Sequence, residues 1–199
     1  MMYIEFLKNT ILGSTMKRLM ELEAARTEDE DVLIIPKEVE VKKEVPLNCE
    51  FKEITDWVKD SKVIRKIDNL VLHCTATPQN TKVSSIINYW KKNLGWRNPG
   101  YHILVTPEGE CSILTELNNV SNGAVGYNHN SIHLSYIGGI DSKQRPLDNR
   151  TEKQLKAFEV LIKAIKEKFP DINIIGHNEV SPKACPCFDV QEYIKNLNL

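Results

Sequence analysis

After residue 66, short apolar runs alternate with longer amphipathic segments, and this alternation is the feature that most restricts the fold. Residues 152–169 carry apolar side chains three and four positions apart, which is the spacing of one helix face. Thr151 and Gln154 predict a capping box at the start of this helix, and Pro170 predicts its end. The apolar runs between such segments are too short for helices and are typical of buried strands. Strands mixed with helices predict the α/β class, with a central mixed β-sheet flanked by helices.

Five runs predict strands and three segments predict helices. The expected strands cover residues 67–74, 101–106, 110–114, 131–137 and 173–175, and the expected helices cover 82–94, 152–169 and 189–197. Residues 107–109, with the sequence Pro-Glu-Gly, join two of these strands and predict a hairpin.

The chain divides into two parts of different composition near residue 50. Residues 1–50 hold 7 basic and 11 acidic residues, whereas residues 51–199 hold 19 and 16. Apolar side chains in residues 3–26 are spaced as in a helix, and residues 32–45 fit an edge strand or an extended linker. We therefore expect an N-terminal helix and charged linker over 1–50, and a single catalytic domain over 51–199. The helix is expected to pack on the domain, on another copy or on a partner, with a membrane-surface anchor or an export signal as alternatives.

The overall charge argues against a dedicated nucleic-acid binder. The 199 residues carry 26 Lys and Arg against 27 Asp and Glu, whereas nucleic-acid binding usually requires a basic excess or stripe. No run approaches the roughly 20 apolar residues of a transmembrane helix. The N-terminus lacks the pattern of a signal peptide, so we expect synthesis in the cytoplasm. Five cysteines are too few, and odd in number, for a disulfide scaffold, which favours reduced thiols or a thiolate used in chemistry.

Two histidines and one cysteine form a candidate metal site. His73 lies near the end of one expected strand, His177 follows another, and Cys185 comes eight residues later in a proline-rich loop. Two imidazoles and a thiolate suit a tetrahedral zinc ion with its fourth position open, as in catalytic sites. The spacing alone equally allows two hydrogen-bonded core histidines and a buried thiol.

Four short motifs add a family resemblance. They read VLHCTAT at 71–77, GYH at 100–102, GYNHNSI at 126–132, and GH at 176–177 followed by PKACP at 182–186. Together they resemble the zinc-dependent N-acetylmuramoyl-L-alanine amidases of the phage-lysozyme type, a family that includes the peptidoglycan recognition proteins. The resemblance covers roughly residues 66–192 and leaves about the first 60 residues without a counterpart.

The resemblance implies an activity and a set of site residues. His73, His177 and Cys185 match the family's zinc ligands, and Tyr101 and Lys183 match its two catalytic side chains. The implied reaction is hydrolysis of the amide between the lactyl group of N-acetylmuramic acid and L-alanine of the stem peptide in bacterial peptidoglycan. Lys183 suits stabilisation of the oxyanion, and Tyr101 suits orientation of the water or donation to the same oxyanion.

Weaker assignments concern the surroundings of this site. The implied substrate-binding residues are Thr75, Asn128, His129 and Asn130. His133 departs from the family pattern and is expected either near the cleft or in simple packing. Cys187 is expected either to compete for the metal or to form a disulfide on oxidation. The group that takes the proton of the water is left open. Glu179 is one candidate, and the alternative is that Glu179 is only a solvated loop carboxylate.

Two other functions compete with the amidase prediction. One is a peptidoglycan-binding module without catalysis, which the matching residue types at all five family positions disfavour. The other is a zinc amidase for a different acyl-amide. In the favoured interpretation, the enzyme is of phage or bacterial origin and acts on the wall after release from the cytoplasm.

Overall fold

The structure, a computed structural model, describes residues 42–45 and 51–197. The helix predicted at 3–26, with its expected packing or self-association, lies outside the described residues. Within the described ranges, no helix has the length and apolar character needed to cross a membrane.

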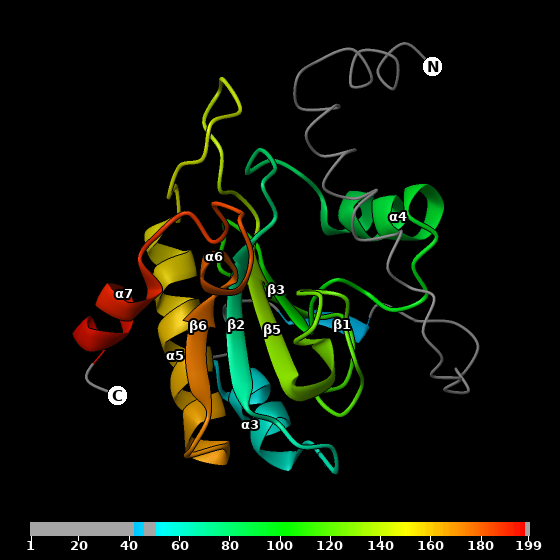
Figure 1. The fold of residues 1–199 in the computed structure, drawn as a ribbon, viewed down its shortest axis with the longest axis vertical. Coiled ribbons are helices and arrows are strands. Elements are labelled where there is room, and N and C mark those ends of the chain that lie inside the picture. The colour runs from blue at the N-terminus through cyan, green and yellow to red at the C-terminus, as the bar shows by residue number, and fades with distance from the viewer. Residues whose placement is uncertain (1–41, 46–50, 198–199) are drawn as a thin grey trace.

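A six-stranded mixed sheet forms the centre of the fold (Figure 1). The strands are β1 (Lys42–Val45), β2 (Asn69–Cys74), β3 (Ile103–Val105), β4 (Cys111–Ile113), β5 (Ser131–Tyr136) and β6 (Asn173–Gly176). Their order across the sheet is β1-β4-β3-β5-β2-β6. The neighbours β3, β5, β2 and β6 run parallel, whereas β4 is antiparallel to both β3 and β1. The sheet is therefore mixed, as the sequence predicts.

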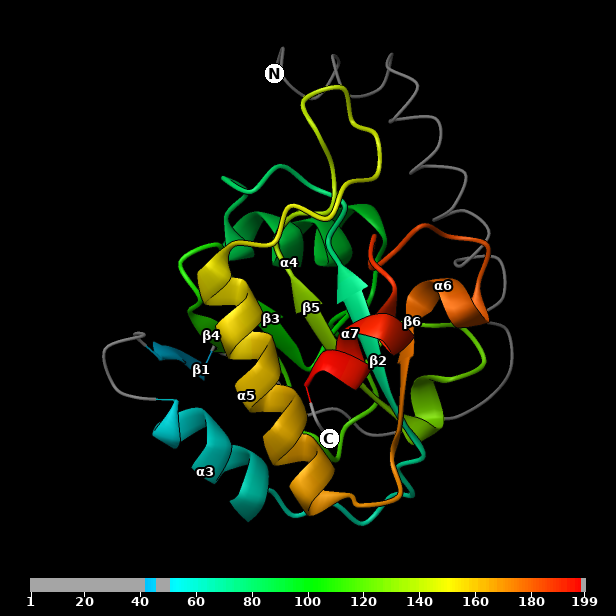
Figure 2. The ribbon, with the colours of Figure 1, turned by 90° about the vertical axis from the view of Figure 1, so that its left-hand side faces the viewer.

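Helices cover both faces of this sheet (Figures 1 and 2). They are α3 (Lys52–Asp60), α4 (Val83–Asn93), α5 (Glu152–Lys168), α6 (His177–Val180) and α7 (Val190–Asn196), with a 3-10 turn, η1, at Asn128–Asn130. The helices α3, α5 and α7 share one face, and α4 lies on the other.

Alternation along the strands divides the apolar residues between two cores. In β3, Ile103 and Val105 join the core that α3 and α5 cover, whereas Leu104 between them joins the core under α4. The first core is large, and Phe158 and Leu161 of α5 are fully buried in it. The second core is smaller and also holds Trp90 of α4.

All predicted strands and helices after residue 66 are present within two residues of their expected ends. Two of the helices in the described part of the chain, α3 and α6, were not predicted. The helix α3 carries a short stripe of three apolar residues, Ile54, Trp57 and Val58, which is too brief to stand out from its charged neighbours. The four-residue α6 is too short to carry a period. The strand β1 confirms the edge-strand alternative for Lys42–Val45, and the boundary at residue 50 stays a prediction.

The capping box of α5 is confirmed and gives a stability prediction. The Thr151 hydroxyl accepts from the backbone N–H of Gln154 (3.1 Å), and its own proton goes to the carbonyl of Pro107 (2.7 Å). Replacing Thr151 by alanine removes both bonds and is expected to lower the free energy of unfolding by about 1–2 kcal/mol in urea titrations. Thr151→Ser keeps the hydroxyl and is the control. Equal stability of the two variants would contradict the role of the cap.

Candidate active site and metal centre

The three predicted metal ligands converge where β2 and β6 end. His73 lies one residue before the end of β2, His177 begins α6 directly after β6, and Cys185 lies in the loop before α7. The Nδ1 atom of His73 is 3.1 Å from Nδ1 of His177 and 3.6 Å from Sγ of Cys185. All three ligand atoms lie within 4.8 Å of one another, and both histidines are buried.

The sheet register explains this convergence. The parallel strands β2 and β6 place Leu72 beside Gly176, so the residues that follow, His73 and His177, emerge at the same level. The turn into α6 is held by Glu179, whose carboxylate accepts from the backbone N–H of Gly176 (2.6 Å). Glu179 is therefore engaged in capping this turn.

The distances suit a tetrahedral ion. Around zinc, two nitrogen ligands lie roughly 3.3 Å apart, and a nitrogen and a sulfur ligand roughly 3.6 Å. The observed separations of 3.1 and 3.6 Å are close to these values. Two imidazole nitrogens that face each other at this distance repel unless a proton or a cation lies between their lone pairs. The donor set therefore fits a metal ion.

Backbone contacts fix the sulfur ligand. The backbone N–H of Cys74 donates to Sγ of Cys185 (3.2 Å), and the same sulfur lies 3.7 Å from the carbonyl of Cys74. The Tyr136 hydroxyl donates to the carbonyl of Pro186 (2.8 Å) and holds the loop at the next residue. The sulfur is thus placed by the sheet although it lies on a loop.

The second thiol of this loop points elsewhere. Cys187 Sγ donates to the carbonyl of Gly139 (3.2 Å) and lies 3.6 Å from Sγ of Cys74, with both thiols unbridged. Among the described residues, the candidate metal group holds Cys185 but not Cys187.

Burial favours the neutral form of the candidate ligand His73. Burial is the largest cause that holds its pKa well below the ordinary value, and the charges of His177, His133 and Lys183 lower the pKa further. A metal ligand must be the unprotonated imidazole, so the surroundings of His73 favour the form that binds metal.

The two predicted catalytic side chains both interact with the candidate ligand His73. The ring centroid of Tyr101 is 5.1 Å from that of His73, and its hydroxyl donates to the carbonyl of Cys74 (3.4 Å). Lys183 lies half-buried in the loop before Cys185, and its charge acts on His73. A phenol therefore lies beside the candidate metal ligand His73, and the charge of Lys183 acts on the same ligand.

A row of buried histidines extends from the metal group into the protein. Nε2 of His73 lies 3.0 Å from Nδ1 of His133, and the ring of His133 stacks on that of His102 at 5.8 Å. All three side chains are fully buried. Burial is the largest cause that lowers the pKa of His133 well below its usual value, and it lowers the pKa of His102 to about 3. The contact of His133 with His73 was not predicted, because it depends on how β2 pairs with β5.

The predicted substrate-binding residues separate into two places. Thr75 directly follows β2 and lies two residues after His73 in the chain. Its hydroxyl accepts from the backbone N–H of Gly138 (3.1 Å). The residues Asn128–Asn130 form η1 at the amino end of β5, where Ser131 pairs with Asn69. That pairing lies four positions before His73, or roughly 13 Å along the strand. The structure therefore does not bring η1 together with the metal group.

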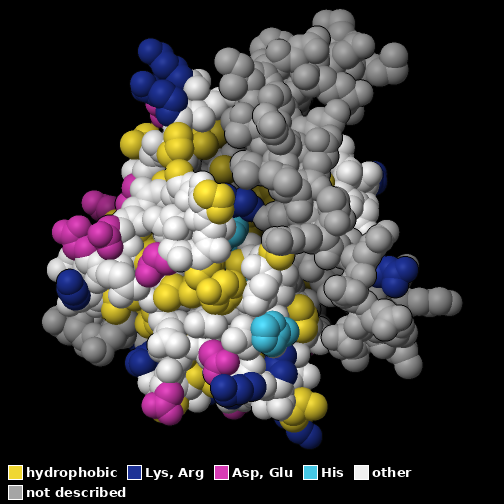
Figure 3. Space-filling model, in the orientation of Figure 1, with side chains coloured by type: hydrophobic (Ala, Val, Ile, Leu, Met, Phe, Trp, Pro, Cys, Tyr) yellow, Lys and Arg dark blue, Asp and Glu magenta, His cyan; other side chains and the backbone are white. Residues whose placement is uncertain are grey.

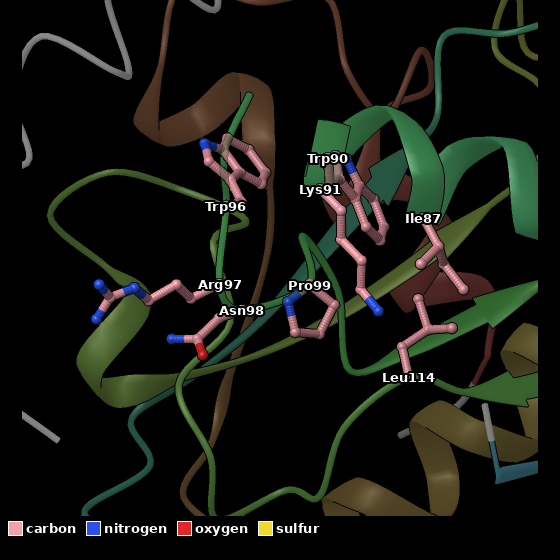
Figure 4. A pocket seen from close by; sticks show the side chains of 8 residues that line it. All are labelled: Ile87, Trp90, Lys91, Trp96, Arg97, Asn98, Pro99 and Leu114. Carbon is pink, nitrogen blue, oxygen red and sulfur yellow. The ribbon is translucent and has the colours of Figure 1, made fainter. Parts of the chain in front are cut away.

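Figure 4 shows a pocket that was not predicted from the sequence. It is lined by Ile87, Trp90, Lys91, Trp96, Arg97, Asn98, Pro99 and Leu114. The Trp90 and Trp96 rings stack at 6.4 Å, and Trp90 meets Tyr101 edge-on at 5.3 Å. Aromatic side chains thus connect the pocket with His73. The pattern of 82–94 had shown Trp90 only as part of a buried helix face.

The charged side chains of the described residues do not gather into one patch on the face that Figure 3 shows. Lys and Arg side chains are scattered there between acidic and uncharged groups.

Comparisons with known proteins agree with this site. A family model described as N-acetylmuramoyl-L-alanine amidase matches residues 64–188. The endolysin of Escherichia phage T7 is 36% identical over 128 residues, covering 63% of this chain and 84% of that protein. The endolysin of Enterobacteria phage K11 is 34% identical over 125 residues, covering 62% and 83%. The solved structure of the Ph2119 endolysin, from a Thermus scotoductus MAT2119 bacteriophage, has a TM-score of 0.57 and 25% identity, covering 70% of this chain and 89% of that one.

The matched segment contains the candidate metal ligands and both residues predicted to be catalytic, and it covers more than half of the chain. The sequence resemblance is thereby confirmed. The chain belongs to the N-acetylmuramoyl-L-alanine amidase family, and it is an enzyme that hydrolyses the amide bond between N-acetylmuramic acid and L-alanine in peptidoglycan.

Proposed function

We propose that the amidase reaction requires a zinc ion held by His73, His177 and Cys185. The convergence of these three ligand atoms within 4.8 Å carries the proposal. Imidazole and thiolate ligands favour zinc over magnesium or calcium, which prefer oxygen. Three protein ligands leave one position for water or substrate, as in catalytic zinc sites.

The chain's own residues complete the chemistry. Zinc bound in this site would polarise the amide carbonyl and lower the pKa of water to about 7. The Lys183 ammonium stabilises the negative charge that develops on the carbonyl oxygen when the amide is attacked. The Tyr101 hydroxyl orients the attacking water or donates to the same oxygen. The contact of Tyr101 with His73 and the effect of the Lys183 charge on His73 support these proposed roles.

The proposed substrate contacts differ in their distance from the scissile amide. Thr75 lies next to the site and is proposed to line the cleft. Roles for Asn128, His129 and Asn130 stay predictions, and they concern parts of the polymer roughly 13 Å from the scissile bond.

The domain plan and the route to the wall are also proposals. We propose that residues 51–199 form the catalytic domain and that the extension before it adds β1 to the edge of the sheet. The two phage relatives are named endolysins, which supports action on the cell wall after release from the cytoplasm where the enzyme is made.

The metal proposal is tested with the full chain on purified cell walls. The release of new L-alanine amino groups and the bound zinc are measured in parallel, before and after treatment with a chelator. We expect about one zinc per chain, loss of activity with loss of zinc, and recovery when zinc is returned. Muramyl peptides are expected to be cleaved, whereas simple N-acetylated amino acids are not.

Three outcomes would contradict these statements. Undiminished hydrolysis by metal-free protein would exclude the zinc mechanism. A zinc-loaded protein that binds walls but releases no amino groups would act as a recognition module. Equal cleavage of simple acetylated amino acids would indicate a broader amidase.

A further inference from the structure

The buried imidazole of His133 contacts the metal ligand His73 on the side away from the metal group. The two residues lie on neighbouring parallel strands, and residues 71 and 133 pair directly. The distance from Nε2 of His73 to Nδ1 of His133 is 3.0 Å, while Nδ1 of His73 faces His177 and Cys185. Each nitrogen of His73 therefore has a separate role.

This geometry determines where the protons lie when the site holds a metal. A ligand nitrogen must present a lone pair, so His73 carries its proton on Nε2. This N–H then donates to Nδ1 of His133, which must be unprotonated. His133 accordingly carries its own proton on Nε2, an atom that is buried and has no hydrogen-bond partner among the described residues.

The ring of His133 is fixed on two sides. Its face stacks on His102 with an angle of 12° between the rings, and the backbone N–H of His133 donates to Nδ1 of His102 (3.0 Å). On another side the ring packs against the backbone of Gly123. A Cβ at position 123 would lie 2.3 Å from Nδ1 of His133, so only glycine leaves room for the ring.

We propose that His133 is a positioning residue that fixes the orientation and tautomer of the metal ligand His73. The inference rests on the proposed zinc site. Partners of this kind hold a metal-bound histidine in place, and their loss commonly lowers metal affinity or activity 10–100-fold. Such a partner is usually a carboxylate, a carbonyl or water, whereas here it is a neutral imidazole. It orients His73 without adding a negative charge beside the ligand.

A matched pair of substitutions isolates the acceptor. In His133→Asn, the side-chain oxygen takes the place of Nδ1 and still accepts from His73. In His133→Leu, the side chain has nearly the same shape as asparagine but has no acceptor. Zinc affinity of the full chain is measured by competition with a chromophoric chelator. We expect a 10–100-fold loss in His133→Leu and an affinity near that of the wild type in His133→Asn.

A spectroscopic readout separates positioning from general damage. The visible absorption of bound cobalt reports the geometry of its ligands. We expect the cobalt spectrum to change in His133→Leu and to stay close to that of the wild type in His133→Asn. Urea unfolding of the metal-free variants shows whether both are folded.

A measurement on the wild type keeps the proposal testable if the leucine variant does not fold. In the zinc-loaded, nitrogen-15-labelled protein, we expect a coupling across the hydrogen bond between Nε2 of His73 and Nδ1 of His133. A wild type without zinc binding would overturn the proposed metal site. A zinc-loaded wild type without this coupling, or a folded leucine variant with unchanged zinc affinity, would overturn the role of His133 alone.

Discussion

Replacing Cys185 by alanine is expected to abolish zinc binding and wall hydrolysis together. The substitution removes one of three ligand atoms and leaves two imidazoles, His73 and His177, which hold a zinc ion far more weakly. Loss of a direct ligand should exceed the 10–100-fold cost that is typical for losing an outer partner, so affinity should fall more than about a hundredfold. Hydrolysis at limiting zinc should fall to the level without enzyme. Bound zinc and released L-alanine amino groups are measured on the same preparation.

The chain offers a matched control two residues away. Cys187 lies in the same loop, but its thiol donates to the carbonyl of Gly139 and is not part of the metal group. Cys187→Ser should therefore keep zinc and activity close to those of the wild type. Equal losses in the two variants would indicate damage to the loop, and activity in Cys185→Ala would exclude the thiolate as a ligand.

The metal group is the part of the site that the sequence predicted best. His73, His177 and Cys185 each lie where a recognisable local signal places them, at a strand end or in a proline-rich loop. Parallel strands bring their carboxyl ends to one edge of a sheet, so side chains that follow two such strands meet there. The motifs then predicted which of the five histidines belong to this group.

The rest of the site depends on the register between paired strands, and local sequence patterns do not predict this register. His133 reaches His73, which lies 60 residues earlier in the chain, because residue 133 pairs with residue 71 across two neighbouring strands. The position of η1 follows from the same pairing, which sets Asn128–Asn130 at the far end of β5. A shift of one position would turn His133 to the opposite face of the sheet. A single sequence therefore predicts these strands more readily than the contacts between them.

The helices also differ in how well the sequence predicts them. The 17-residue helix α5 has a long apolar stripe and a capping box, and both features are readable in the sequence. The nine-residue helix α3 is stabilised mainly by packing against the core, where Ile54 and Val58 are buried. Short helices gain most of their stability from such tertiary contacts, so their own residues predict them poorly.

Replacing Lys183 by alanine is expected to leave zinc in place and to lower kcat about 10²–10³-fold, the usual cost of losing one oxyanion donor. Lys183 is not part of the metal group, but its charge acts on the candidate ligand His73. Because the stabilised charge exists only during the reaction, KM for a defined muropeptide should change little. Zinc content, kcat and KM are measured together.

The control for Lys183→Ala is Lys195→Ala, which removes the same charge from an exposed position on α7. It should leave kcat unchanged, since a distant, exposed ammonium is screened by solvent. Two results would contradict the oxyanion role. Near wild-type turnover in Lys183→Ala would show that the ammonium does not stabilise the developing charge. A raised KM with unchanged kcat would show that Lys183 binds the substrate and the transition state equally, so that it contributes to affinity rather than to the chemical step.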